Sequence, residues 1–409
     1  MSQIIDMNNV NSVSFNNNAV NEINLNNTKI WPLTTTVYGV KIDLANSDPE
    51  TSVTYTDNAV GFSKSYMDFA NDTFVWGSWQ DKWPFNQVKP CLFKNGAVVK
   101  YLNPNNYAQD TDGNSVDITG PDGDVMIEIP KIYYKLSKDA NYQYIQISNT
   151  AQTGFCCLAH TYKGVEKNKV YIGAYQSYND NTKSKSISGV SATGNISLNT
   201  WRTYARNQGS GYENFYWDLL ILLQCLYVIQ FKNLNSQSAL GRGSFGQSDY
   251  SISGGLNTKG LYYGTSTRGQ MKFLGIEDFY GGRSQLIDGA YTLSTRNLAT
   301  IDSTDPTVDY NGSGTGYTDR GYTLSRTLGG YTTAIMGSNC GGFVPTSNQG
   351  SATTYYCDRG HITTNTGCVP DFGGYNNIAN NGYGGAFYLT FTNNADNASD
   401  TRCGRLAFC

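Results

Sequence analysis

The alternation of apolar and polar residues predicts strands over much of the chain. Residues 387–391 alternate Phe, Leu and Phe with Tyr and Thr, which is the period of a strand with one buried face. Between residues 126 and 136 the pattern predicts a pair of strands, and Lys94-Asn95-Gly96 has the composition of a hairpin turn. The same reasoning predicts further strands at residues 36–44, 53–55, 91–93, 97–99, 155–158, 170–175 and 406–408.

The first thirty residues contain a tandem repeat of ten residues, in which Val10–Ala19 aligns with Val20–Lys29. Each unit predicts a short alternating strand followed by an Asn-rich turn. A single hairpin of this size cannot bury its apolar edge alone. We therefore expect residues 1–31 to dock on a larger assembly, in a homotrimer; a floppy N-terminal tail is the alternative.

Two segments have helical spacing. Ser197–Thr200 opens a helix that places Trp201, Tyr204 and Ala205 on neighbouring turns, and Tyr216–Phe231 is apolar on all sides, as an enclosed helix would be. Residues 261–288 then predict short strands separated by Gly turns, with long loops after them. Two helices, a small twisted sheet and long loops predict an α+β fold.

Composition narrows the class of protein. Only 15% of the 409 residues are charged and the net charge is −3, without a basic stripe, which argues against nucleic acid as a partner. A chain with 31 Tyr and 44 Gly but few charges is typical of a β-rich extracellular or virion protein. The apolar run Phe215–Phe231 is interrupted by polar residues and is shorter than the roughly 20 residues of a bilayer span, so we expect no membrane insertion.

Met1–Asp6 lacks the features of a signal peptide. We therefore expect synthesis in a host cytoplasm and release by another route, such as phage lysis.

The chemistry-bearing residues favour neither catalysis nor a metal site. The nine cysteines form no CxxC motif, and most are expected to be buried thiols, with a disulfide near the C-terminus as the alternative. The chain has two histidines, and the best polar cluster, Asp358-Arg359-Gly360-His361, has no nucleophile beside it in the sequence. We expect a protein that is not an enzyme, without catalytic residues, metal ligands or a cofactor.

The polar residues near the C-terminus are the candidate binding residues. Asn, Tyr, Asp and Ser are concentrated in Gly- and Asn-rich segments between the predicted strands, and this is the composition of a paratope: Tyr gives rigid contact area and Asn and Ser give adaptable hydrogen bonds. An ordinary polar loop at a chain end is the alternative. The candidates are Tyr375, Asn376, Asn377, Asn380, Asn381, Tyr383, Asn393, Asn394, Asp396, Asn397, Ser399 and Asp400.

Residues 120–409 resemble the C-type lectin fold, in the branch shared by formylglycine-generating enzymes and the variable proteins of diversity-generating retroelements. The resemblance is carried by Tyr171–Tyr175, Trp217–Leu220 with Asn235–Gln237, Gly275–Gly281 with Leu286–Gly289, and Gly384–Phe387 with Cys403–Phe408. Segments 35–43 and 126–135 resemble N-terminal regions of phage tail proteins. The resemblance implies a C-terminal surface of variable Asn, Tyr, Asp and Ser residues, diversified at adenines, above a constant strand that ends in Gly-Arg-Leu-Ala-Phe.

These expectations combine into one interpretation: a docking hairpin repeat at 1–31, a β-rich spacer at 32–120 and a C-type lectin-like receptor-binding domain at 121–409. We expect a phage tail-tip protein of the virion, attached to a tail or baseplate protein through its N-terminus and binding a bacterial surface receptor, protein or glycan. The alternatives are an oxidoreductase like the formylglycine-generating enzymes, a sugar-binding lectin, and a purely structural tail component.

Overall fold

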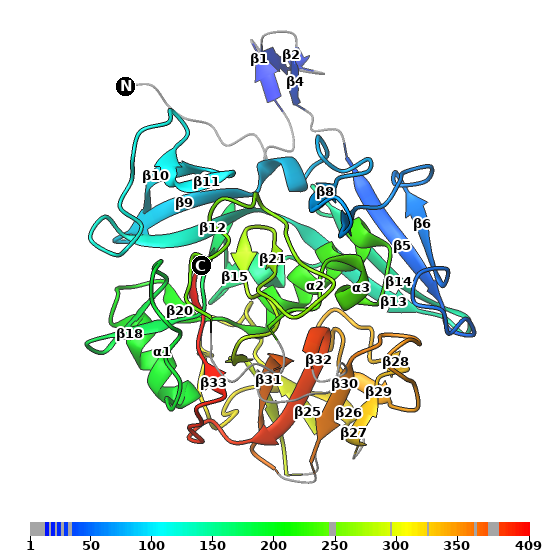
Figure 1. Cartoon of the computed structure of the whole chain (residues 1–409). Coiled ribbons are helices and arrows are strands. Elements are labelled where there is room, and N and C mark those ends of the chain that lie inside the picture. Colours follow the sequence, from blue (N-terminus) through cyan, green and yellow to red (C-terminus); the bar gives the residue numbers. More distant parts are fainter. Residues whose placement is uncertain are drawn as a thin grey trace.

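The computed structural model describes residues 35–244, 251–294, 297–324, 327–363, 366–374 and 384–409, together with the backbone of four short strands before them. These four are paired as two hairpins, β1 (Val13–Phe15) with β2 (Asn18–Val20) and β3 (Ile23–Leu25) with β4 (Thr28–Trp31). The second hairpin begins ten residues after the first, so the sequence repeat is also a structural repeat (Figure 1).

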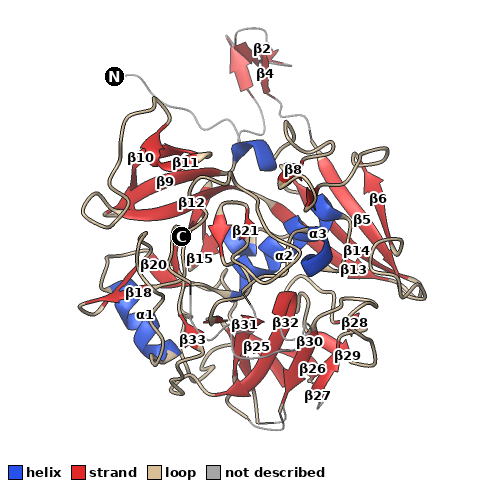
Figure 2. Cartoon of the chain, in the orientation of Figure 1, coloured by secondary structure: helices blue, strands red, loops and turns tan. Residues whose placement is uncertain are grey.

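A four-stranded antiparallel sheet and a seven-stranded antiparallel sheet form the first part of the molecule (Figure 2). The four-stranded sheet has the order β13 (Tyr133–Lys138), β14 (Tyr142–Ser148), β5 (Val37–Asp43) and β6 (Val53–Asp57). The seven-stranded sheet has the order β11 (Asn106–Asp110), β10 (Ala97–Asn103), β9 (Lys89–Lys94), β12 (Asp124–Pro130), β17 (Lys169–Gly173), β34 (Leu406–Phe408) and β20 (Tyr212–Asn214).

The predicted hairpin turn joins β9 to β10, with Asn95 and Gly96 both at positive φ. The two strands predicted between residues 126 and 136 are present as β12 and β13, but they belong to different sheets and do not pair. The expected boundary at residue 120 lies between β11 and β12, which are strands of one sheet, and one hydrophobic core extends from Tyr38 to Cys409.

Helix α2 (Trp217–Phe231) lies at the centre, where every one of its residues is buried. It contacts β5 and β14 on one side and β32 (Gly384–Asn393) on another, as Figure 1 shows. An enclosed helix needs apolar residues on every face, so the pattern read from the sequence is confirmed. Helix α1 (Leu198–Arg206) is also confirmed, and its first residue follows Ser197, whose hydroxyl accepts a hydrogen bond from the Thr200 N–H.

A six-stranded mixed sheet forms the C-terminal part. Its order is β27 (Thr327–Tyr331), β30 (Arg359–Ile362), β32, β31 (Val369–Gly374), β23 (Ser284–Leu286) and β33 (Arg402–Cys403). The pairs β30–β32 and β23–β33 are parallel, and the other pairs are antiparallel. The remaining elements are β7 (Tyr66–Asp68), β8 (Thr73–Val75), β15 (Thr161–Tyr162), β16 (Val165–Glu166), β18 (Tyr178–Asp180), β19 (Lys183–Lys185), α3 (Ser236–Ala239), β21 (Lys272–Phe273), β22 (Ile276–Glu277), β24 (Ala290–Thr292), β25 (Asn297–Thr300), β26 (Thr318–Thr323), β28 (Ala334–Ile335), β29 (Pro345–Ser347) and the 3-10 helices η2 (Phe85–Gln87) and η3 (Leu158–His160).

The predicted α+β class is wrong, because the protein is mainly β, with 38% strand against 10% helix and three α-helices in the described residues. Both predicted helices exist, but the segment expected to be long loops contains strands β24 to β31. Many of these strands are short and rich in Gly and Thr, so they show little alternation of apolar and polar residues in the sequence.

The last strand, β34, is an interior strand of the seven-stranded sheet and lies between β17 and β20. Arg405, directly before it, is completely buried. All nine cysteines are free thiols and seven are buried, which confirms the expectation for most of them. Among the described residues, no helix is long and apolar enough to cross a membrane.

Candidate functional site

Strand β32 separates an apolar face from a polar one. Phe387, Leu389 and Phe391 point into the core, where the rings of Phe387 and Tyr227 lie 5.7 Å apart. The alternation read from the sequence is therefore confirmed for this strand. Tyr388, Thr390 and Thr392 occupy the opposite face and line a hollow of about 270 Å³.

This polar hollow is defined by side chains from five strands of the six-stranded sheet and from the adjoining segments. Its floor is lined by Ser284, His361, Asp371, Tyr388, Thr390 and Arg402. At its edge lie Thr363, Thr392, Thr401 and Asn393, one of the predicted binding residues. Apart from one Asp, one Arg and the His, the lining consists of hydroxyl and amide side chains, so the hollow suits a small polar group rather than an apolar one.

Asp371 and Arg402 form a buried ion pair at the floor, with 2.9 Å between Asp371 Oδ2 and Arg402 Nε. Thr390 Oγ1 donates a 3.4 Å hydrogen bond to the same carboxylate oxygen. The other oxygen, Asp371 Oδ1, is buried without a hydrogen-bond partner among the described residues. Burial raises the pKa of Asp371 to about 6, although Arg402 opposes the shift. The carboxylate is therefore an unsatisfied acceptor beside the hollow.

His361 supplies a second unsatisfied atom. Its Nε2 is enclosed and has no hydrogen-bond partner in the described part of the chain. Burial lowers the pKa of His361 below its usual value, and Arg359 adds to the effect, so the ring is neutral at neutral pH. A neutral imidazole nitrogen can donate or accept, and a ligand group in the hollow could pair with it.

The loop of residues 393–400 leaves the end of β32 next to the hollow, and it contains the six predicted residues that the structure describes. Asn394, Asp396, Asn397 and Asp400 are exposed, whereas Asn393 and Ser399 are partly buried. In the middle of the loop, Ala395 is 1% exposed and belongs to a small core with Leu198 and Trp201. The loop is thus anchored at its centre by the buried Ala395, and the polar side chains on either side of Ala395 face the surface.

Three polar side chains from the scaffold hold the displayed residues. Asn199 Nδ2 donates to Asp396 Oδ1 at 2.6 Å, and Arg402 Nη1 donates to Asn397 Oδ1 at 2.7 Å. The third contact is the ion pair between Arg283 Nη1 and Asp400 Oδ1 at 2.9 Å, in which 60% of the Asp400 side chain stays exposed. Each of these loop side chains is held by one group and keeps other polar atoms available.

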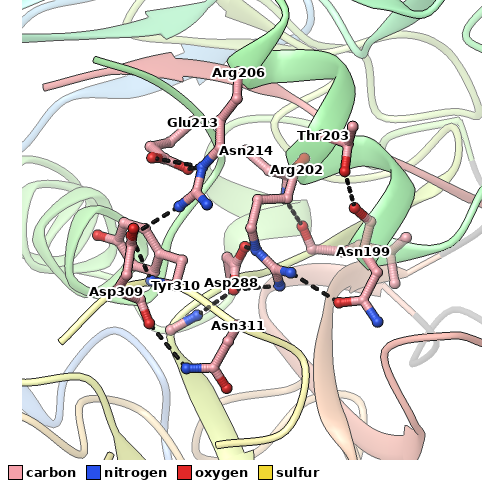
Figure 3. A network of polar contacts seen from close by, with 12 residues as sticks. Asn199, Arg202, Thr203, Arg206, Glu213, Asn214, Asp288, Asp309, Tyr310 and Asn311 are labelled. Atoms are coloured by element: carbon pink, nitrogen blue, oxygen red, sulfur yellow. Dashed lines mark hydrogen bonds and ion pairs between the residues drawn. The ribbon is translucent and has the colours of Figure 1, made fainter. Parts of the chain in front are cut away.

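Side chains of helix α1 connect the loop contacts to acidic residues in the protein interior (Figure 3). Arg202 binds both carboxylate oxygens of Asp288, at 2.6 and 3.0 Å, and donates a 2.8 Å hydrogen bond to Asn199 Oδ1. One turn later, Arg206 binds Glu213 and Asp309 at 3.0 and 2.8 Å. Bidentate Arg–carboxylate pairs fix the geometry of both partners, so Asn199 is already oriented toward the loop.

The structure describes six of the twelve predicted binding residues, all of them in the 393–400 loop. Tyr375, Asn376, Asn377, Asn380, Asn381 and Tyr383 lie outside the described residues, between Gly374 and Gly384, which pair with each other at one end of the β31–β32 ladder. Asn393 pairs with Val369 at the other end. A strand of ten residues is roughly 30 Å long, and this length separates Asn393 from Gly384.

Sequence reasoning missed Ser284, Asp371 and Arg402, which come from three strands and meet only in the folded sheet. It did single out His361, as part of the cluster Asp358–His361, but in the structure Asp358 and His361 lie in different environments. Asp358 is 1% exposed and accepts a hydrogen bond from the backbone N–H of Phe387 at 2.9 Å, whereas His361 lines the hollow. The sequence signal that could have identified Asp371 is its charge within the otherwise apolar stretch Val369–Phe372.

The described residues contain no group of three or more His, Cys, Asp or Glu side chains that could hold a metal ion. Comparison of the sequence with protein-family models and with curated proteins gives no match.

Proposed function

We propose that this chain recognises a receptor on a bacterial surface, as the receptor-binding protein of a phage tail, through the 393–400 loop and the polar hollow beside it. The observation that carries the proposal is the support beneath the loop: Asp396, Asn397 and Asp400 are each held by a side chain of the scaffold while remaining at the surface. The bacterial and phage parts of the proposal come from the composition and the resemblance of the sequence.

Pre-organisation is the physical reason for placing recognition in this loop. Ordering a flexible side chain on binding costs about 0.5–1.5 kcal/mol. Here Ala395 and the three polar contacts order the loop before any ligand arrives. Binding through several short polar side chains gives modest affinity at one site, and a trimer would multiply it through effective concentration.

The hollow extends the surface with a recess for one polar group of the receptor. Asp371 Oδ1 and His361 Nε2 have no partners in the described residues, and leaving such atoms unsatisfied in a buried site costs about 1–3 kcal/mol each. A hydroxyl or amide that enters the hollow would recover part of this free energy. Groups that lack hydrogen-bonding capacity would not, which gives the hollow selectivity.

The test is adsorption of the purified protein to a panel of bacterial strains. We expect strain-selective binding that the double substitution Asn394→Ala, Asn397→Ala lowers at least tenfold, with a melting temperature close to that of the unsubstituted protein. The matched control is Asn46→Ala, because Asn46 Oδ1 accepts from the backbone N–H two residues on, as Asn394 Oδ1 does, but lies in another loop. Equal binding by the double variant and the unsubstituted protein would refute the site, and no binding to any strain would favour a structural tail component.

A further inference from the structure

A larger cavity lies on a different part of the molecule. It has a volume of about 780 Å³ and lies among β8, the beginning of β9, β10 and residues 258–263. Figure 1 shows β8 and β10 at the upper side of the molecule, away from β30 and β32 at the lower side. We call it the aromatic pocket. Its volume is in the range of pockets that bind small molecules, and the 393–400 loop takes no part in it.

One wall of the aromatic pocket is a rigid group of rings. Phe74 stacks on Tyr262 with 4.3 Å between ring centroids and 6° between planes. Trp76 packs edge-on against both, at 5.2 and 5.0 Å. Tyr262 is buried, while Phe74 and Trp76 are partly exposed. Because each ring is fixed by the others, the wall keeps its shape without a ligand.

The polar groups of the pocket carry a net positive charge. Asp72 and Lys259 neutralise each other in a 2.9 Å ion pair. Lys89 lies 5.2 Å from the centre of the Tyr101 ring and makes no ion pair in the described part of the chain. Glu128, its neighbour across the ladder, is bound at 2.8 Å by Lys169. An ammonium group is therefore available at one side of the pocket.

Two exposed amide side chains complete the lining. Gln80 and Asn105 lie in the pocket, and neither side chain makes a hydrogen bond within the described ranges. The combination is thus a wall of aromatic rings, two amides and one cation. Each part alone is common on protein surfaces, but together in a preformed cavity they specify a ligand with flat C–H faces, several hydroxyls and a negative charge.

We propose that the aromatic pocket binds an acidic saccharide, a stretch of glycan that carries a carboxylate such as a uronic acid. The C–H faces of sugar rings pack on aromatic faces, whose quadrupole presents negative charge to them. Hydroxyls pair with the amides of Gln80 and Asn105, and the carboxylate pairs with Lys89. Single-stranded nucleic acid would also stack on the rings, but it requires a track of cations along the backbone, and this chain has a net charge of −3.

The inference is independent of the 393–400 loop, so the two proposals can fail separately. Calorimetric titration of the full chain with tetrasaccharides of galacturonate, mannuronate and hyaluronate is the test, with maltotetraose and an octamer of thymidylate as comparisons. We expect at least one acidic tetrasaccharide to bind and maltotetraose to bind more weakly. Lys89→Gln should weaken the acidic ligand roughly tenfold, as expected for loss of one charge-assisted hydrogen bond.

Control variants distinguish binding in the aromatic pocket from effects of overall charge and from binding by the 393–400 loop. Lys138→Gln removes an exposed lysine of another sheet and should leave the affinity unchanged, as should the substitutions of Asn394 and Asn397. Trp76→Phe keeps the ring packing largely intact and should weaken acidic and neutral sugars alike. Failure of all three acidic tetrasaccharides to bind, equal affinity of Lys89→Gln and the unsubstituted protein, or tighter binding of the oligonucleotide would each overturn the inference.

Discussion

Arg405 provides the most direct test of the reasoning about the scaffold. Its guanidinium is completely buried and donates to four acceptors: Gln285 Oε1 at 2.6 Å, and the backbone carbonyl oxygens of Gly173, Glu277 and Asp278 at 2.9, 2.9 and 2.8 Å. These acceptors lie in segments that are far apart in the sequence. One side chain therefore joins the start of the C-terminal strand to β17, to β23 and to the end of β22.

The substitution Arg405→Ala removes every donor and leaves four buried acceptors. At about 1–3 kcal/mol for each buried acceptor left unsatisfied, the loss is roughly 4–12 kcal/mol. Domains have unfolding free energies of about 5–15 kcal/mol, so the variant should be largely unfolded or retain only a small part of its stability. Arg405→Lys keeps one cationic group but cannot reproduce the planar fork, and we expect it to lose at least about 2 kcal/mol.

Urea-induced unfolding, followed by tryptophan fluorescence and far-ultraviolet circular dichroism, measures these losses. Arg320→Ala is the matched control, because Arg320 is only partly buried and donates to two oxygens, Thr300 Oγ1 at 2.7 Å and Ile301 O at 3.2 Å. Its loss should be about 1 kcal/mol. Cooperative unfolding of Arg405→Ala with a loss no larger than that of the control would refute the assignment of Arg405 as a central support of the fold.

Two further predictions concern the backbone and the pH dependence of stability. Gly385 has a φ of 144°, and a Cβ at this position would overlap the carboxylate of Asp358, so Gly385→Ala should lower the free energy of unfolding by more than about 2 kcal/mol. The control Gly61→Ala, at a φ of 85° with open space around it, should lower it by about 1 kcal/mol. Equal losses in the two variants would show that steric overlap at Gly385 is irrelevant. Asp218 in α2 has a pKa raised to about 7 by burial, so its contribution to stability is complete below its unfolded pKa near 4 and is lost as the pH rises through 7. Asp218→Asn should therefore reduce the decline of unfolding free energy between pH 4 and 7 by up to about 1.4 kcal/mol per pH unit, which urea titrations at several pH values would measure, and an unchanged slope would contradict the assigned pKa.

Local patterns in the sequence predicted the elements whose stability depends on near neighbours. Asn95-Gly96 specifies a hairpin turn because both residues adopt positive φ, and α2 is recognisable because a helix enclosed on all sides needs a continuous apolar run. The period of ten residues at the N-terminus reappears as two successive hairpins. In each case the signal lies within a single continuous segment of the sequence.

The candidate site was only partly predictable. The composition of residues 393–400 indicated a polar surface loop, and four of its six predicted residues, Asn394, Asp396, Asn397 and Asp400, are exposed. The hollow beside it depends on Asp371 and Arg402, which are thirty-one positions apart and come from strands separated by β23 in the sheet. No periodicity links two such residues, because their proximity results from strand order.

The sequence by itself determined the strands with clear alternation, helices α1 and α2, the predominance of buried thiols and a low content of charged residues. Tertiary structure decided that β12 and β13 join different sheets, that β34 enters between β17 and β20, and that the whole is mainly β. It also decided that Gly374 pairs with Gly384 at one end of the β31–β32 ladder and that Asn393 pairs with Val369 at the other. The physical reason is that local preferences select the conformation of a segment, whereas sheet order and the position of buried polar groups depend on contacts between segments far apart in the chain.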